Sequence, residues 1–287
     1  MASTYNDLYL DTRQELRQAG VPAAQLEARE LLCFAADKSR EQLYRDMPLY
    51  APDHIARRFR ELVKRRLAGE PLAYIIGEWD FYGITLDICR DVLIPRPDTE
   101  TLVDRGIEFV KRLPGVTRVL DLCAGSGCVG VALARHSPRS RVILADWSED
   151  ALRICRQNIR RCDLISRMST TRVDALEPAP SGLSDFDLIL CNPPYIPTGE
   201  IPGLEISVRD YEPRLALDGG LDGLDFYRSV ATGWKAALRL GGKLCFEVGF
   251  DQAEAVEQIM ELNGYERILV TEDAAGRCRV VEGVCKD

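Results

Sequence analysis

Apolar residues recur at helical spacing from about residue 4 to Gly69. Leu8 and Leu16 fall on one face of a first helix, and a second helical stretch follows a Gly-Val-Pro break. A longer amphipathic helix begins at Pro52 and ends at Gly69, with apolar positions three or four residues apart. Residues 1–70 are therefore predicted to form a small all-helical domain.

The pattern then changes to that of short strands. Aromatic and β-branched residues at 74–76 and at 79–89, around Gly83, are typical of a β-hairpin. Residues 94–97, Ile-Pro-Arg-Pro, form a stiff connector because each proline restricts its own φ and the residue before it. Residues 71–97 are predicted to be a hairpin linker.

A helix is expected next, running to about Leu113, with Asp98 or Thr99 as its N-cap. Beyond it, apolar strands alternate with helical stretches, which predicts a mostly parallel sheet with helices on both faces. The predicted strands are residues 118–122, 141–145, 187–191, 243–248, 268–271 and 278–284. A tight turn between the last two indicates an antiparallel edge hairpin. Residues 98–287 are thus predicted to form an α/β domain.

Composition limits the class of protein. The chain has 287 residues, of which 46% are hydrophobic and 29% charged, as expected of a soluble globular protein with two domains. No stretch approaches the ~20 apolar residues of a membrane span, and the N-terminus does not resemble a signal peptide. The ten cysteines include no C-x-x-C pair and there are only two histidines. We expect reduced thiols in a cytoplasmic protein and no metal site.

The net charge of −8 argues against a nucleic-acid partner, because such partners usually meet a basic surface. One basic cluster lies in the long N-terminal helix. It comprises Arg57, Arg58, Arg60, Lys64, Arg65 and Arg66. A solvated helix face explains this cluster, and an electrostatic docking patch is the alternative.

The loop after the first α/β strand reads Asp121-Leu122-Cys123-Ala124-Gly125-Ser126-Gly127. Gly125 and Gly127 let the backbone turn sharply and approach a ligand closely. A nicotinamide-binding loop would read G-x-G-x-x-G around a pyrophosphate. Here we interpret the pattern as D-x-x-x-G-x-G, in which Asp121 would repel a pyrophosphate but suit the ammonium of an amino-acid group. A turn with no ligand is the alternative.

Carboxylates after the next two strands favour a ligand. Asp146 ends the second strand, where its two oxygens would accept both hydroxyls of a ribose. Asp174, followed by Ala175, ends the third strand region, where it would meet the amino group of an adenine. Each alone is also explained as a helix cap, but their order matches S-adenosylmethionine binding. The predicted cofactor-binding residues are Asp121, Cys123, Ala124, Gly125, Ser126, Gly127, Asp146, Asp174, Ala175 and Asn192.

The tetrad Asn192-Pro193-Pro194-Tyr195 follows the apolar strand at residues 187–191, at the edge where open α/β sheets bind ligands. Its two prolines make a stiff corner. The side-chain oxygen of Asn192 and the carbonyl of Pro193 would accept both N–H groups of a planar NH₂, and Tyr195 would stack on it. Holding that nitrogen in line with a methyl donor would supply most of the acceleration. The tetrad resembles the motif of methyltransferases that alkylate amide or nucleobase nitrogens, which makes these four residues the predicted catalytic residues; a plain β-turn is the alternative.

With both motifs placed, the chain resembles the PrmC/HemK family. The similarity covers almost the whole chain and includes residues 66–77, the connector at residues 93–100 and the segment at residues 211–223. The last two are more specific than the general methyltransferase motifs. The resemblance implies a Rossmann-like, seven-stranded, S-adenosylmethionine-dependent methyltransferase domain after the helical domain and the hairpin linker. It also implies that Asn192 and Pro193 bind the substrate amide.

The family methylates N5 of the glutamine in the Gly-Gly-Gln loop of class I peptide chain release factors. The resemblance therefore implies a cytoplasmic protein-glutamine methyltransferase whose partners are release factors, with neither nucleic acid nor a membrane involved. Two departures concern the cofactor loop and its surroundings. Cys123 and Ala124 stand where members often have Gly-Thr or Gly-Ser, which makes the loop stiffer, and Ala175 stands where some members have a bulky aromatic residue.

Three other functions stay open at this level. A glutamine methyltransferase acting on a ribosomal protein would share most of these motifs. An N6-adenine nucleic-acid methyltransferase would also grip a conjugated NH₂, but it must extrude a base, and the acidic chain counts against it. A binding scaffold without catalysis is the third, and the intact tetrad counts against it.

Overall fold

The computed structural model describes residues 3–286. The chain divides in sequence between Gly77 and Glu78 into two compact units. The first unit is helical, as the apolar periodicity predicts. Its elements are α1 (Tyr5–Gln18), α2 (Ala24–Ala36), α3 (Arg40–Asp46), α4 (Asp53–Leu67) and α5 (Leu72–Ile76). Leu16, Leu31, Leu32 and Phe59 are at most 1% exposed and form its core.

Three residues of the basic cluster in α4 stabilise this helical unit. Arg58 donates to the carbonyl of Ala35 at 3.3 Å and lies 4.9 Å from the ring centroid of Phe34. Arg66 pairs with Glu27 of α2, and both side chains are largely buried. Arg65 donates two hydrogen bonds of 2.8 Å to the carboxylate of Glu70, which is 4% exposed. Part of the cluster therefore holds the unit together, and the docking alternative concerns only the other basic residues.

The strand predicted at residues 74–76 is wrong, because these residues lie in helix α5. Pro71 precedes the helix with a φ of −58°, and Gly77 ends it in the left-handed region with a φ of 85°. The N–H of Gly77 donates to the carbonyl of Ala73, which closes the last turn. Tertiary burial of Tyr74 and Ile75 outweighs their preference for strands.

The hairpin itself is confirmed, over a shorter range than predicted. Strands β1 (Glu78–Phe81) and β2 (Ile84–Asp87) pair antiparallel. Their two-residue turn, Tyr82-Gly83, has positive φ at both positions, 51° and 72°. That geometry matches the right-handed twist of the flanking strands.

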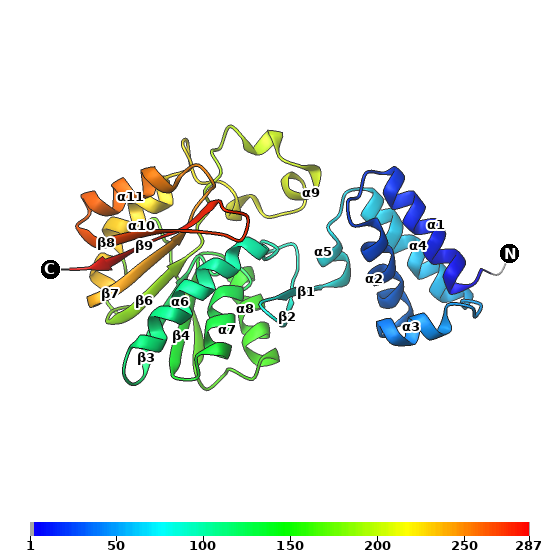
Figure 1. Ribbon diagram of the computed structural model, residues 1–287, viewed down its shortest axis with the longest axis horizontal. Helices are drawn as coiled ribbons and strands as arrows, with labels where there is room; N and C mark the ends of the chain where they lie inside the picture. Colours follow the sequence, from blue (N-terminus) through cyan, green and yellow to red (C-terminus); the bar gives the residue numbers. More distant parts are fainter. Residues whose placement is uncertain (1–2, 287) are drawn as a thin grey trace. The chain divides into compact units, whose positions relative to one another are not determined.

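A seven-stranded mixed sheet forms the centre of the second unit (Figure 1). Its order is β5-β4-β3-β6-β7-β9-β8, with β9 antiparallel to both neighbours. The strands are β3 (Thr117–Leu122), β4 (Ser140–Asp146), β5 (Met168–Arg172), β6 (Phe186–Cys191), β7 (Leu238–Glu247), β8 (Tyr265–Glu272) and β9 (Cys278–Cys285). All six predicted strands are present. The final hairpin is confirmed too, although its second strand inserts beside β7, so only β8 is at the edge.

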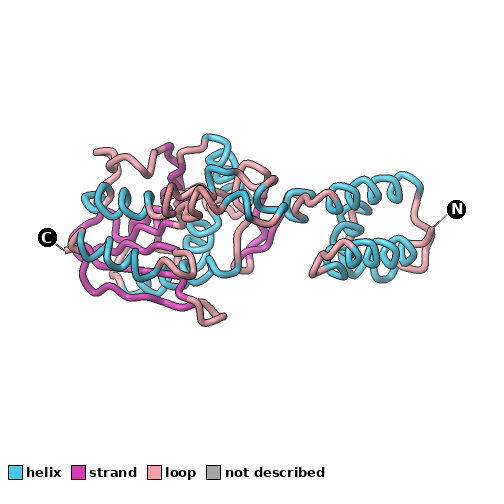
Figure 2. The backbone as a smooth tube through the Cα atoms, turned by 90° about the horizontal axis from the view of Figure 1, so that it is seen from above, coloured by secondary structure: helices cyan, strands magenta, loops and turns pink. Residues whose placement is uncertain are grey.

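The helices of this unit flank the sheet on both faces, as the alternating pattern predicts (Figures 1 and 2). They are α6 (Glu100–Arg112), α7 (Cys128–His136), α8 (Glu149–Arg161), α9 (Ile206–Arg209), α10 (Asp225–Gly233) and α11 (Ala253–Leu262). From β3, the chain adds β4 and β5 toward one edge of the sheet, and the strands from β6 onward are added toward the opposite edge. Because parallel crossovers are right-handed, α7 and α8 pack on one face and α10 and α11 on the other.

The N-cap predicted at Asp98 or Thr99 is confirmed in position, since Thr99 is the N-cap residue of α6, but its side chain does not cap the helix. A 3₁₀ turn, η1 (Pro97–Thr99), leads directly into α6, so Thr99 is already helical and makes no side-chain capping bond. Asp98 instead pairs with Arg279 of β9 at 3.0 Å. The hydroxyl of Thr99 accepts a hydrogen bond from the side-chain amide of Asn192 at 3.4 Å. The connector is thereby held against the tetrad.

No helix within residues 3–286 is long and apolar enough to cross a membrane. All ten cysteines are free thiols. Within the same described residues, no three His, Cys, Asp or Glu side chains gather in a way that would hold a metal ion.

A buried ion-pair network links α6 to β7 and β9. The carboxylate of Glu282, 2% exposed, accepts hydrogen bonds from Arg105 at 2.9 and 2.7 Å and from Lys243 at 2.6 Å. Burial by itself raises the pKa of this carboxyl, but the two cations outweigh burial and hold the pKa below its usual value.

Replacing Glu282 by alanine should lower the free energy of unfolding by about 3 kcal/mol, because the largely buried Lys243 loses its carboxylate and Arg105 keeps only its pair with Glu108. Urea denaturation measures the loss. The matched control is Glu266→Ala, whose exposed pair with Lys286 should matter by less than about 1 kcal/mol. Since the folded pKa of Glu282 is depressed, its stabilisation should be present above the unfolded pKa of about 4.3 and disappear as the pH falls through the folded value. Equal losses in both variants would contradict this role.

Candidate active site

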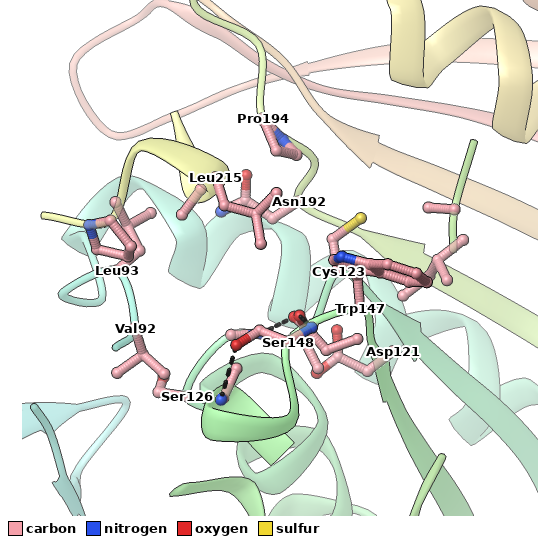
Figure 3. A pocket seen from close by; sticks show the side chains of 18 of the residues that line it. Val92, Leu93, Asp121, Cys123, Ser126, Trp147, Ser148, Asn192, Pro194 and Leu215 are labelled. Atoms are coloured by element: carbon pink, nitrogen blue, oxygen red, sulfur yellow. Dashed lines mark hydrogen bonds between the residues drawn. The ribbon is translucent and has the colours of Figure 1, made fainter. Parts of the chain in front are cut away.

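A pocket lies at the carboxyl ends of β3, β4 and β6, beside the point where the strand order reverses (Figure 3). This is the place where open α/β sheets bind ligands. Of the predicted site residues, the pocket lining includes Asp121, Cys123, Ala124, Gly125, Ser126, Asp146, Asp174, Ala175, Asn192 and Pro194. The lining does not include Gly127, Pro193 or Tyr195. In Figure 3, Asn192 and Pro194 lie at one end of the pocket and Ser126 at the other.

Gly125 and Gly127, in the loop after β3, have different structural roles. Gly125, with a φ of 55°, faces the pocket, and its N–H donates to Oδ2 of Asp146 at 2.8 Å. Gly127 packs inward: a Cβ there would lie 2.7 Å from Cδ1 of Leu144. Cys123 adopts a φ of 62°, which an L-residue reaches only with strain. Glycine would adopt this backbone conformation without that strain, and the greater stiffness of the loop stays a prediction.

Asp121 lies beneath this loop and is 2% exposed. Its Oδ2 accepts a hydrogen bond from the N–H of Gly130 at 2.8 Å. Burial raises the pKa of Asp121 to about 7, and only the bond from Gly130 opposes this rise strongly. A cationic group beside the carboxylate would restore its ionised form, so Asp121 suits an ammonium.

Gly130 is a residue that the sequence prediction missed. A Cβ at this position would lie 2.3 Å from Cδ2 of Leu144 and 3.0 Å from Oδ2 of Asp121, so only glycine fits. With Gly125 and Gly127 it completes the spacing G-x-G-x-x-G. The prediction that the glycine spacing differs from that of a nicotinamide-binding loop is therefore wrong. The distinguishing feature is the carboxylate of Asp121.

Asp146 is oriented by two backbone groups. Its Oδ1 accepts from the N–H of Ser148 at 2.9 Å, and its Oδ2 from that of Gly125 at 2.8 Å. Each oxygen keeps a second acceptor site, as a ribose diol requires. The cap of α8 is Ser148, whose hydroxyl accepts from the N–H of Ala151. A capping role therefore does not explain Asp146.

Asp174 lies two residues past the end of β5 and lines the pocket. Its Oδ1 accepts from the N–H of Leu176 at 2.9 Å, which forms a local turn. Trp147, directly after Asp146, is 49% exposed and also lines the pocket. The guanidinium of Arg172 lies 4.4 Å from its ring centroid and steadies the indole. The sequence prediction missed Trp147; its place right after a strand-end carboxylate was the available signal.

The tetrad forms a corner after β6. Asn192 lines the pocket and donates from Nδ2 to the hydroxyl of Thr99 at 3.4 Å. Pro193 and Pro194 are buried. Tyr195 packs against the hydrophobic core, and burial raises its pKa to about 12. Its carbonyl accepts from Nε2 of Gln252 at 2.9 Å. Tyr195 as a lid on the substrate stays a prediction.

The segment at residues 211–223 clamps this corner. The N–H of Ile196 donates to the carbonyl of Leu217, and the N–H of Gly219 donates back to Ile196, both at 2.9 Å. A Cβ on Gly219 would lie 2.7 Å from Cα of Tyr195, and one on Gly223 would lie 2.3 Å from its carbonyl oxygen. The glycines therefore permit backbone-to-backbone contact, which explains why this segment accompanies the tetrad.

The connector and the clamp also form one wall of the pocket. Arg96 pairs with the buried carboxylate of Glu212, which joins the two segments. Burial raises the pKa of Glu212, and the guanidinium of Arg96 opposes this. Sequence reasoning singled out both segments as family signatures but named none of their residues for the site. Those lining the pocket include Leu93, Pro95, Arg96, Thr99, Pro213, Leu215 and Ala216.

Comparison with known proteins agrees with this architecture. A family model described as the PrmC N-terminal domain matches residues 7–77, and one described as the methyltransferase small domain matches residues 100–202. A release factor glutamine methyltransferase of Geobacter sulfurreducens is 41% identical, over 95% of this chain and 93% of the relative. One of Caulobacter vibrioides is 36% identical, over 99% and 97%. The hMettl16 catalytic domain, solved with an RNA hairpin, has a TM-score of 0.59 and 15% identity over 79% of this chain and 83% of that chain, which shows the fold alone.

The sheet order, the glycine loop with its strand-end carboxylates and the tetrad together define a Rossmann-like methyltransferase. Identity to the relatives extends through both units of the chain. The chain belongs to the family of release factor glutamine methyltransferases.

Substituting Gly219 by alanine should lower the free energy of unfolding by about 1–3 kcal/mol, since the added Cβ overlaps the backbone of Tyr195. Gly199→Ala is the matched control, because its Cβ would meet nothing within 4 Å. That variant should stay within about 0.5 kcal/mol of the parent. Denaturant titration compares the two, and a neutral Gly219→Ala would show that the clamp is loose.

Proposed function

We propose that this protein transfers a methyl group from S-adenosylmethionine to N5 of the glutamine in the Gly-Gly-Gln motif of class I peptide chain release factors, in the cytoplasm. The observation that carries the proposal is the Asn192 corner at one end of a pocket whose other end holds a glycine loop and strand-end carboxylates. Membership of the family supports the choice of a protein glutamine as the target. We further propose residues 1–70 as the recognition domain and residues 71–97 as its linker.

The donor set of the pocket fits S-adenosylmethionine. Bound there, the cofactor supplies a methyl group on a sulfonium, whose positive charge makes the carbon electrophilic. Asp121, whose raised pKa suits a neighbouring cation, would meet the ammonium group. Asp146 would accept the ribose hydroxyls through the free acceptor sites of its two oxygens. Asp174, Ala175 and the exposed Trp147 would surround the adenine.

The substrate amide would bind at the tetrad. An amide nitrogen is a poor nucleophile because its lone pair is delocalised into the carbonyl. The side-chain oxygen of Asn192 and the carbonyl of Pro193 would accept its two N–H groups, which orients the nitrogen toward the methyl carbon. Since neither proline at the corner has an N–H, the backbone presents only acceptors there. Positioning, more than acid–base chemistry, would supply the acceleration, and the proton would leave after transfer.

Two rival targets have weaker support. The hMettl16 domain was solved with RNA, but a likeness at 15% identity concerns the fold only. The acidic net charge also disfavours a nucleic-acid substrate. A ribosomal-protein glutamine has no feature of the described pocket in its favour over a release factor.

Mass spectrometry of a class I release factor after incubation with the protein and S-adenosylmethionine should find one added methyl on the Gly-Gly-Gln glutamine. Asn192→Ala should slow this reaction on the order of 10²-fold or more, since the amide loses an acceptor that positions it. Gln258→Ala, at an exposed position of α11 outside the proposed recognition domain, is the control and should match the parent. An intact fold that adds no methyl would sink the proposed function, and methylated duplex DNA would favour the rival.

Cofactor affinity provides a separate check. Asp146→Ala should weaken binding of S-adenosylmethionine by roughly 10- to 100-fold, because the variant loses two charged acceptors and the bond that orients Gly125. Asp150→Ala, an exposed neighbour at the start of α8, should bind as the parent does. Isothermal titration calorimetry gives both dissociation constants. Unchanged affinity in Asp146→Ala would remove this residue from the cofactor site.

A further inference from the structure

The side chain of Asn192 has two chemically different ends, and only one of them serves an amide substrate. Its Oδ1 accepts hydrogen bonds, whereas its Nδ2 donates them. A substrate NH₂ needs the acceptor. A rotation of the amide by half a turn would present a donor to the substrate and prevent binding. Something must therefore hold this amide in one orientation.

Strand register brings a carboxylate beside this amide. Cys191 of β6 pairs in parallel with Phe246 of β7, and both belong to the hydrophobic core. Asn192 directly follows Cys191 at the end of β6, and Glu247 directly follows Phe246 on the adjacent strand β7. Since side chains alternate along a strand, both leave the face opposite to the core pair. Glu247 is 2% exposed and, unlike Asn192, does not line the pocket.

Thr99 completes the arrangement from the connector. It is 2% exposed, lines the pocket and accepts from Nδ2 of Asn192 at 3.4 Å. The side chains of Thr99 and Asn192 both interact with the carboxylate of Glu247. An ionised carboxylate only accepts hydrogen bonds, so the end of the amide that faces it must be Nδ2. The opposite end, Oδ1, then faces away from Glu247.

We propose that Glu247 and Thr99 are positioning residues that hold Nδ2 of Asn192 away from the substrate and present Oδ1 to the substrate amide. The inference rests on the proposed function, because it concerns how Asn192 meets an NH₂ group. Oε2 of Glu247 has no hydrogen-bond partner among the described residues. A buried carboxylate with spare acceptor capacity at this point is costly unless it serves such a purpose.

The protonation of Glu247 would make this positioning depend on pH. Burial raises the pKa of Glu247 to about 7, and contacts with Thr99 and Asn192 and the charge of Arg279 oppose the rise. The charged and titratable groups that act on it or feel it are Asp98, Cys128, Tyr195, Tyr227 and Arg279. When Glu247 takes up a proton it becomes a donor on one oxygen, and it no longer demands Nδ2 of Asn192. Activity should therefore fall as the pH drops below about 7.

Two isosteric variants test the proposal in the full-length protein. Glu247→Gln and Thr99→Val should each lower kcat for release-factor methylation by at least 10-fold, with the dissociation constant for S-adenosylmethionine unchanged by calorimetry. Glu247→Gln should also lose the decline in kcat between pH 8 and pH 6. Thr99→Ser, which keeps the hydroxyl, should recover most of the activity lost in Thr99→Val. Glu272→Gln, an exposed glutamate at the end of β8, is the control.

The outcomes distinguish failure of the positioning role from failure of the proposed function. If the parent protein methylates no release factor, the proposed function fails. If the parent is active and both variants keep its kcat and its pH profile, the positioning role is overturned while the function stands. A parallel loss of cofactor binding in both variants would also overturn it, because the effect would then be a general distortion. If Glu247→Gln does not fold, Thr99→Val and its rescue by Thr99→Ser decide.

Discussion

The pairing of β3 with β6 is the constraint on which the site depends. Leu122 and Cys191 are register partners at the carboxyl ends of these strands. Their neighbours, the glycine loop and the tetrad, are therefore adjacent in space although some 70 residues separate them in the sequence. The strand order reverses at this pair, so no crossover helix covers the crevice. A methyl donor held on one strand end thus meets an acceptor held on the next.

Around this pair, the protein buries carboxylates that would be costly elsewhere. Asp121 and Glu247 are each 2% exposed, and burial raises the pKa of both to about 7. Buried charges of this kind are unfavourable for folding unless they are paired. The Glu282 network shows the paired alternative, in which two cations hold a carboxyl pKa low. Perturbed carboxyl groups are therefore concentrated near the pocket, where a positive or hydrogen-bonding ligand can use them.

Much of the fold could be predicted, because local patterns carry it. The six predicted strands, the helices on both faces and the closing hairpin follow from periodicity alone. The errors fall where tertiary contacts outweigh local preference. Residues 74–76 have the composition of a strand, yet burial and the flanking Pro71 and Gly77 make them helical. Thr99 does occupy the N-cap position of α6, but its hydroxyl accepts a hydrogen bond from Asn192 and does not cap the helix.

By itself, the sequence determined the order of elements, the acidic strand ends and the stiff corner, since each depends on neighbouring residues. Only the tertiary structure decided that Gly130 supports Asp121, that Tyr195 packs into the core, and that residues 211–223 clamp the corner. It also decided which side chains, those of Thr99 and Glu247, interact with Asn192. These relations join distant parts of the chain through sheet order and register, which local hydrophobic patterns do not encode. For that reason the chemistry of the site was readable from its residues, whereas its supporting contacts were not.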